Sequence, residues 1–184
     1  MKKTQKILLY AIALILLLGV CACSQNNKAN QDINPIEVVQ AVINKLEINP
    51  EDIGEQFYSE GDEEHILDEI LLRMMFPPSF SDDDVIEYSM DLFEKYAVVQ
   101  YEKYKPEIFE IGIFRVSHDN ITTVENMCKE RLVKARNEIF EYNAENAHYA
   151  DDSKVYVFDN YIYYIISANS PAAYDTIKSG LALK

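Results

Sequence analysis

The chain of 184 residues has no tryptophan and only five glycines and three histidines. It contains no phosphate-binding motif of the P-loop or dinucleotide type, and five glycines leave few places to cradle a phosphate. It also lacks a Gly-x-Ser-x-Gly nucleophile elbow, an HExxH motif and a His-x-x-x-His pair, so no familiar hydrolase or zinc motif is present. Carbohydrate sites stack most often on tryptophan, and its absence argues against a sugar-binding protein.

Basic residues are scarce as well. Lysine and arginine number 17 against 31 aspartates and glutamates, which gives a net charge of −14 at pH 7. A surface this acidic repels phosphate backbones and anionic lipid head groups. We therefore expect neither nucleic-acid binding nor electrostatic adhesion to a bilayer.

The N-terminus has the layout of a secretory signal followed by a lipobox. Three lysines within residues 2–6 precede an apolar run at 7–20 that is short for a membrane span. Val20-Cys21-Ala22-Cys23 then resembles the bacterial lipobox, in which a small residue directly precedes the acylated cysteine. Ala22 fits that position better than Val20, so we expect cleavage after Ala22 and a lipid on Cys23. The alternative is an ordinary signal peptide cleaved at the same bond, with Cys23 as a free thiol.

Removal of residues 1–22 would leave 14 basic and 31 acidic residues, a net charge of −17, and two cysteines, Cys23 and Cys128. No intrachain disulfide is then expected despite the oxidising location, so the hydrophobic core must stabilise the fold by itself. Two acyl chains such as palmitate on one cysteine, at about 0.8 kcal/mol per buried methylene, give a stable anchor. The predicted location is the extracytoplasmic face of the cell membrane.

The mature chain is expected to consist of a tether and one domain. Residues 23–34 contain the lipidated cysteine and a polar segment without periodicity, which we interpret as a flexible tether. Residues 35–184 are predicted to form a single α+β domain. The patterns in its first half predict a helix over 35–47 capped by Asn34, a turn-like segment over 50–62, a helix from Asp62 with the stripe Ile66, Leu67, Ile70, Leu71 and Met74, and a short helix capped by Ser81.

The hydrophobic pattern changes in the second half, where β-branched and aromatic residues predict strands. This order of elements is typical of an α+β fold, and we expect a small antiparallel sheet with helices packed on one face. The predicted elements are strands at 97–99 and 108–116, a helix at 120–142, a hairpin at 155–158 and 161–166 that turns at Asp159-Asn160, and a closing helix from Ser170-Pro171 that Gly180 ends.

Several of these segments together resemble a family of uncharacterised Gram-positive lipoproteins that carries a domain of unknown function. The segments are the lipobox, PEIFEIGIFRV, KERL in the long helix, and DNYIYYIIS with the helix after it. The similarity covers roughly residues 85–180 and includes Glu110, Arg131 and Tyr161. The family tends to have Gly-Asn-Tyr at the hairpin turn, where this chain has Asp159-Asn160-Tyr161. The resemblance implies a lipid-anchored protein of this fold and implies no catalytic residues.

The remaining polar residues have structural explanations. Asp82-Asp83-Asp84 lacks the alternating ligands and the glycine of a calcium loop, and suits the positive end of a helix dipole. His65, His118 and His148 are scattered along the chain, so we predict no metal site and no cofactor. Cys128 lies on the apolar stripe of the long helix, which favours a buried, inert thiol over a nucleophile.

Tyrosines provide the candidate interaction surface. Tyr101 and Tyr104 lie in or beside a predicted loop, while Tyr161 and Tyr163 share one side of the predicted hairpin. An exposed row of these side chains is a possible contact surface for another protein.

The preferred hypothesis is therefore a non-catalytic, lipid-anchored binding or interaction module, with another envelope protein or a peptide as its partner. The alternative is a small envelope hydrolase that uses dispersed polar residues, Glu107, Glu110 and His118, near the end of a predicted strand. A solute receptor for a transporter is a third possibility, but it usually needs two larger lobes than this chain can form.

Overall fold

The computed structural model divides the chain into two units, Met1–Asp32 and Ile33–Lys184. It describes residues 32–61, 66–81, 84–86, 88–101, 108–142, 144–167 and 170–182. The predicted signal, Cys23 and most of the predicted tether lie outside these residues. The prediction ends the tether at Asn34, yet Ile33 is buried and Asn34 caps the first described helix. The packed domain therefore begins slightly earlier than predicted.

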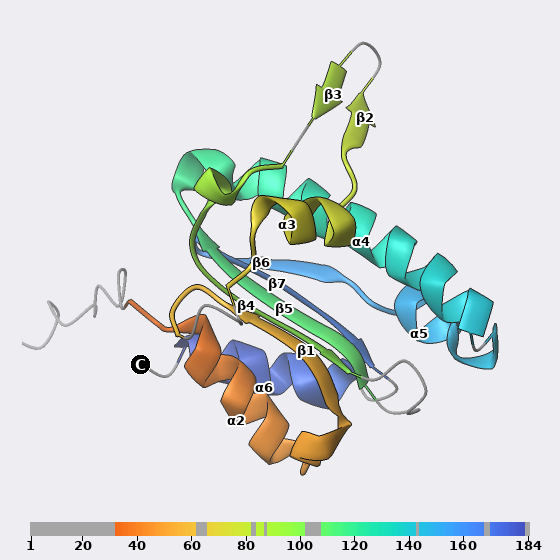
Figure 1. Ribbon diagram of the computed structural model, residues 1–184. Coiled ribbons are helices and arrows are strands. Elements are labelled where there is room, and N and C mark those ends of the chain that lie inside the picture. The colour runs from red at the N-terminus through yellow and green to blue at the C-terminus, as the bar shows by residue number, and fades with distance from the viewer. Residues whose placement is uncertain are drawn as a thin grey trace, which may run out of the picture. The chain divides into compact units, whose positions relative to one another are not determined.

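Five strands form one antiparallel sheet in the order β1-β4-β5-β7-β6 (Figure 1). This sheet and the helices beside it confirm the predicted α+β fold. β1 falls in the segment predicted to be turn-like, because Gly54 and Glu55 obscure its strand pattern and its pairing with β4 decides its conformation. The strands are β1 Ile53–Tyr58, β4 Phe93–Tyr101, β5 Ile108–Val116, β6 Val155–Phe158 and β7 Tyr161–Ser167.

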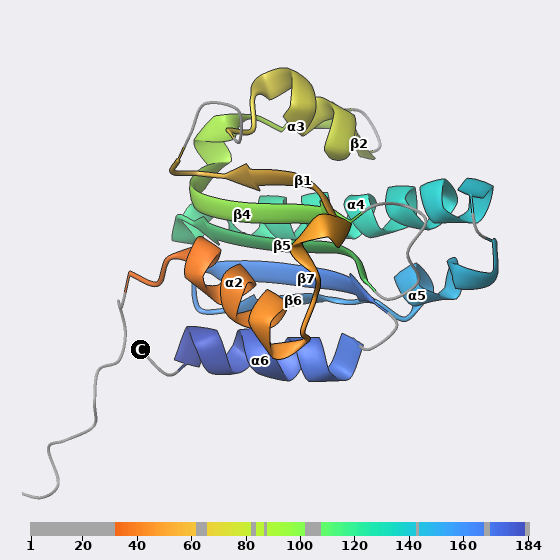
Figure 2. The same cartoon turned by 60° about the horizontal axis from the view of Figure 1, so that its bottom comes forward.

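Helices cover both faces of the sheet, so the predicted arrangement on one face is wrong (Figure 2). All seven residues of β7 are buried. Because successive side chains of a strand point to opposite faces, a strand without exposed residues needs a layer on each side. The layers are α2 Pro35–Lys45 and α6 Ser170–Ala182 on one face, and α3 Glu69–Met75, α4 Ile121–Tyr142 and α5 His148–Asp151 on the other.

Elements with strong local signals form as predicted. The Asn34 side chain accepts a hydrogen bond from the Ile36 N–H, 3.0 Å away, and begins α2. The helix predicted at 120–142 is α4. Asp159 has φ +54° in the two-residue turn between β6 and β7, the conformation of the first central residue of a hairpin turn. Among the described helices, none combines the length and the apolar character needed to cross a membrane.

Gly180 does not end the closing helix, which continues to Ala182. A Cβ atom at this position would lie 3.1 Å from Cγ1 of Val38 on α2. The glycine therefore allows α6 to approach α2 closely, and close helix packing explains it better than helix termination.

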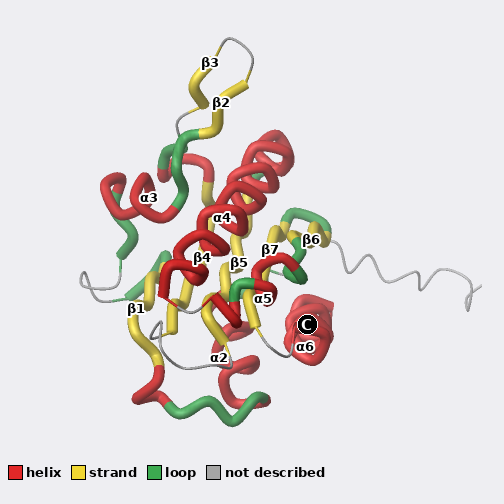
Figure 3. Tube along the Cα trace, turned by 90° about the vertical axis from the view of Figure 1, so that its right-hand side faces the viewer, coloured by secondary structure: helices red, strands yellow, loops and turns green. Residues whose placement is uncertain are grey.

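The helix predicted from Asp62 is present but shorter than expected, and the helix predicted after Ser81 is wrong. α3 begins only at Glu69, and Asp68 caps it by accepting a hydrogen bond from the Leu71 N–H at 2.7 Å. The segment after Ser81 forms a hairpin of β2 Ser79–Ser81 and β3 Asp84–Ile86, which projects from the helices (Figure 3). The residues of α3 and those directly before it have two apolar stripes, and the periodicity of the sequence could not show which of the two is buried. Of the expected stripe, Leu67 is buried but Ile66, Ile70 and Met74 are exposed, and Leu72 and Met75, which the prediction did not include, are buried.

Candidate functional site

The predicted tyrosine surface is not exposed. Tyr101, Tyr161 and Tyr163 are buried, and Tyr104 lies outside the described residues. The reason is the second helical layer: α2 and α6 cover the side of the sheet on which all three rings lie. The prediction of an exposed row at these positions is therefore wrong.

Tyr161 instead fastens the start of the domain to the sheet. Its hydroxyl accepts a hydrogen bond from the Ile33 N–H and donates one to the Ile33 carbonyl, each at 2.9 Å. The N–H and the carbonyl of Ile33 therefore both have a hydrogen-bond partner in this buried position. A phenylalanine at position 161 could not provide one, because it lacks the hydroxyl. This contact gives a structural reason for a tyrosine after the hairpin turn.

A charged network lies on the opposite face, between β5, β7 and α4. Glu110 and Arg131 are only 2% and 3% exposed, and Arg131 Nε lies 2.9 Å from Glu110 Oε1. The second carboxylate oxygen of Glu110 accepts a hydrogen bond from Gln100 Nε2 at 2.9 Å, and the Tyr164 hydroxyl donates to the first. Arg131 also donates to Glu138 Oε2 at 2.8 Å. Both buried charges are therefore paired and hydrogen-bonded.

Burial and the charges of this network shift the pKa values of Arg131, Tyr164 and Cys128. Burial alone would lower the pKa of Arg131, but the adjacent Glu110 carboxylate outweighs it and raises that pKa. Burial, and then the charge of Glu110, raise the pKa of the Tyr164 hydroxyl and of the Cys128 thiol well above their ordinary values. Cys128 is fully buried, in agreement with the prediction of an inert thiol. The network is a structural unit of the core.

The residues of the alternative hydrolase hypothesis do not meet. Glu110 is buried near the start of β5 and paired with Arg131, whereas His118 is exposed beyond the end of the same strand. At about 3.3 Å per residue, the six residue steps from Glu110 to Val116 alone separate them by about 20 Å. Glu107 lies outside the described residues. The structure therefore gives this trio no shared site.

An open groove of about 1090 Å³ lies beside β6, where α5, β7 and α6 provide its other walls. We name it the tyrosine groove after Tyr156, Tyr163 and Tyr174, which line it together. The Tyr156 ring stacks on that of Tyr163 with 5.4 Å between centroids and 13° between planes, and lies 4.4 Å from that of Tyr174. Tyr156 is 37% exposed, so part of this aromatic side chain is accessible from solvent.

Tyr174 connects the groove wall to the sheet. Its hydroxyl accepts a hydrogen bond from the Lys154 N–H at 2.9 Å and donates toward the carbonyls of Lys154 and Ile165, at 2.7 and 3.1 Å. Burial raises the pKa of Tyr174 to about 12, although these backbone contacts oppose the rise. Burial, followed by Tyr156 and Asp175, likewise raises the pKa of Tyr163. Both phenols are neutral at physiological pH.

Charges of both signs border the groove. Lys154 and Lys178 line it together with Asp152 and Asp175. Within the described part of the chain, neither lysine forms an ion pair, whereas Lys95, Lys129 and Lys134 do. The groove is thus locally balanced on a chain of net charge −14.

The sequence pattern predicted the hairpin but not the groove. Tyr174 belongs to the next helix and Lys154 precedes the strand, so no spacing in the sequence brings them together. One signal was available: Val155–Phe158 is an apolar run directly before a two-residue turn, and three of its residues remain exposed. Exposed apolar residues in a row are typical of a contact surface.

No family model, curated protein or solved structure matches this chain. The resemblance to the lipoprotein family therefore stays a prediction. The three residues named for that resemblance each make a buried structural contact, since Glu110 pairs with Arg131 and the Tyr161 hydroxyl bonds to the backbone of Ile33. Among the residues that the structure describes, no three His, Cys, Asp or Glu side chains are placed to hold a metal ion.

Proposed function

We propose that this chain is a lipid-anchored, extracytoplasmic binding module without catalytic activity, and that it holds a segment of another envelope protein or peptide in the tyrosine groove. The observation that carries the proposal is the exposed, stacked Tyr156 on the edge strand β6, in which Val157 and Phe158 are also exposed. Tyrosine offers a large rigid contact area with a polar tip, and it is enriched at protein interfaces for that reason.

The dimensions and the charge of the groove favour a peptide over a compact small molecule. Small-molecule pockets usually enclose most of the ligand, whereas this groove of about 1090 Å³ is open to solvent. A strongly acidic partner is repelled by a chain of net charge −14, and the two lysines and two aspartates that line the groove offer no local excess of either charge to a strongly charged segment. The geometry therefore suits an elongated segment of low net charge.

Peptide selection tests this function. A phage library of random linear dodecapeptides is panned on the full chain in detergent micelles, after depletion on empty micelles. We expect enriched peptides whose affinity, measured by fluorescence anisotropy, falls at least tenfold in the Tyr156→Ala variant, because truncating an interface tyrosine commonly costs more than about 1.4 kcal/mol.

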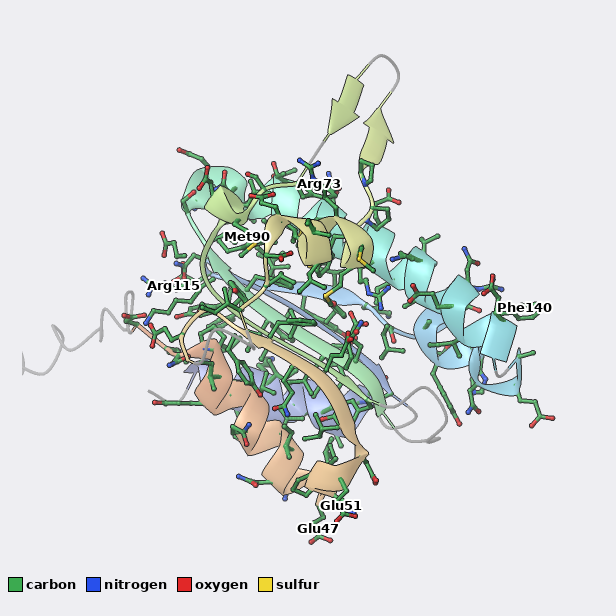
Figure 4. All side chains as sticks on the ribbon, in the orientation of Figure 1. Glu47, Glu51, Arg73, Met90, Arg115 and Phe140 are labelled. Atoms are coloured by element: carbon green, nitrogen blue, oxygen red, sulfur yellow. The ribbon has the colours of Figure 1, made fainter. Side chains whose placement is uncertain are left out.

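Phe140→Ala is the matched control for Tyr156→Ala. Phe140 is an exposed aromatic residue near the end of α4, does not line the groove, and points away from the sheet (Figure 4). Peptide affinity should be unchanged in this variant. Failure to enrich any peptide, or equal affinities for the wild type and Tyr156→Ala, would contradict the proposed function.

The anchor is a separate part of the proposal, supported by Val20-Cys21-Ala22-Cys23 after the apolar run. Cells that express the full chain are fed an alkyne-tagged fatty acid, and the protein is labelled by click chemistry. We expect label on the wild type and on Cys21→Ser, and complete loss of label in Cys23→Ser. Label that persists in Cys23→Ser would show that Cys23 is not the acylated residue.

A further inference from the structure

The two edges of the sheet differ in how they are protected. β1, at one edge, has the charged Glu55 and an irregular register between Ile53 and Gln56, both of which discourage pairing with another strand. β6, at the other edge, contains no charged residue and pairs with β7 in regular register. Tyr156, Val157 and Phe158 are 37%, 43% and 38% exposed. An apolar, regular edge of this kind is a template for a further strand.

The backbone of β6 faces outward at its odd-numbered residues. Phe158 and Tyr161 flank the two-residue turn, so the backbone N–H and carbonyl of Phe158 face β7. The N–H and carbonyl of Lys154 also face β7, because both contact the Tyr174 hydroxyl, which also contacts the Ile165 carbonyl of that strand. Backbone groups alternate in direction along an antiparallel strand. Those of Val155 and Val157 therefore point away from the sheet, toward the position of a neighbouring strand.

We propose that the segment bound by this protein adds to the sheet as a sixth strand beside β6; the inference rests on the proposed function and specifies its binding mode. Main-chain hydrogen bonds to Val155 and Val157 would align the added strand. Its alternate side chains would enter the tyrosine groove, because Tyr156 and Phe158 lie opposite Tyr163 and Tyr161 and face the same side of the sheet as α6.

The occupant is an extended peptide strand of low net charge with apolar or aromatic side chains at alternate positions. The alternation follows from the pleat of a β-strand, because only alternate side chains of the added strand lie on the α6 side of the sheet, where Tyr156 and Phe158 also lie. Low net charge follows from the two lysines and two aspartates that border the groove. A second copy of the chain fits less well, because two molecules of net charge −14 repel one another.

Backbone methylation of the selected peptides tests this mode on the unaltered full chain. Each peptide from the library is resynthesised with one N-methyl group at successive positions. We expect a period of two over the bound residues: methylation weakens binding at least tenfold where the N–H pairs with β6, and less than threefold at the positions between. Affinities that show no such alternation would overturn strand addition.

Two substitutions at one residue provide the matched protein variants. Val157→Pro removes the outward N–H, while Val157→Ala keeps it and shortens the side chain. We expect peptide binding to be at least tenfold weaker in Val157→Pro than in Val157→Ala, because both variants replace the valine side chain but only proline removes the N–H; melting temperatures show whether both variants fold. If Val157→Pro does not fold, the methylation series on the wild type still decides the proposal.

The outcomes separate this proposal from the function on which it rests. Peptides that depend on Tyr156 but show neither the alternation nor the Val157→Pro effect would overturn strand addition and leave the groove as the binding site. A library that yields no peptides would overturn both. Sedimentation of the wild type as a dimer and of Val157→Pro as a monomer would identify a second copy as the occupant and overturn the heterologous strand.

Discussion

Replacement of Arg131 by methionine is expected to lower the free energy of unfolding by about 3–5 kcal/mol, because the Glu110 carboxylate would remain buried without its counter-charge. Methionine retains much of the apolar volume of the arginine stem, so the loss is chiefly electrostatic. Glu138 would also lose its 2.8 Å contact with Arg131. Urea unfolding of the full chain, followed by far-ultraviolet circular dichroism, measures the difference.

Two comparisons isolate the buried charge. Arg136→Met breaks the exposed ion pair with Asp151 and should cost no more than about 1 kcal/mol, because solvent screens both groups. The double variant Glu110→Gln/Arg131→Met removes both buried charges and should be more stable than Arg131→Met alone. If Arg131→Met and Arg136→Met were equally destabilised, the buried pair would have no special role in the fold.

The same substitution should change how stability depends on pH. Burial would raise the pKa of Glu138, but the Arg131 charge outweighs burial and holds that pKa below its ordinary value of 4.5. A carboxylate with a lowered pKa stabilises the fold above pH 4.5, and this contribution is lost as the pH falls through the folded-state pKa. Arg131→Met should therefore lose less stability through this acidic range than the wild type does.

The position of Arg131 could have been predicted from the sequence, although its partner could not. Val124, Cys128 and Ala135 form the buried stripe of α4, and Arg131 continues the same helical spacing. A charged residue within an apolar stripe needs a buried partner of opposite sign. The identity of that partner depends on the strand register that places Glu110 under α4, and one sequence does not determine this register.

Long elements were predictable where short ones were not. α4 and the β6–β7 hairpin have local signals that agree with their surroundings: a long apolar stripe in the helix, and Asp159-Asn160 between two apolar runs. β1 and α3 are short, and each takes its conformation from the surface it packs against. The second helical layer had a visible signal, since β7 is apolar on both faces, but the sequence prediction places Tyr161 and Tyr163 on an exposed side of the strand.

Replacement of Gly112 by alanine should destabilise the domain by about 3 kcal/mol, the upper end of the usual cost of overpacking a core. Gly112 lies directly opposite Tyr164 in the β5–β7 register, and a Cβ atom there would lie 2.5 Å from Cε1 and 2.7 Å from Cζ of the tyrosine ring. The ring is fully buried and its hydroxyl donates to Glu110, so it cannot move aside without breaking the charged network. Urea unfolding again measures the loss.

Gly180→Ala is the matched control for this clash. Its Cβ would lie 3.1 Å from a Val38 methyl carbon, a contact that small shifts can relieve, and alanine is favoured over glycine within a helix by about 1 kcal/mol. We expect its stability to stay within about 1 kcal/mol of the wild type. Adding Tyr164→Leu to Gly112→Ala should cost less than the two changes summed separately, because the leucine side chain lacks the ring that clashes. Additive losses would place the cost of Gly112→Ala in the strand backbone rather than in its contact with Tyr164.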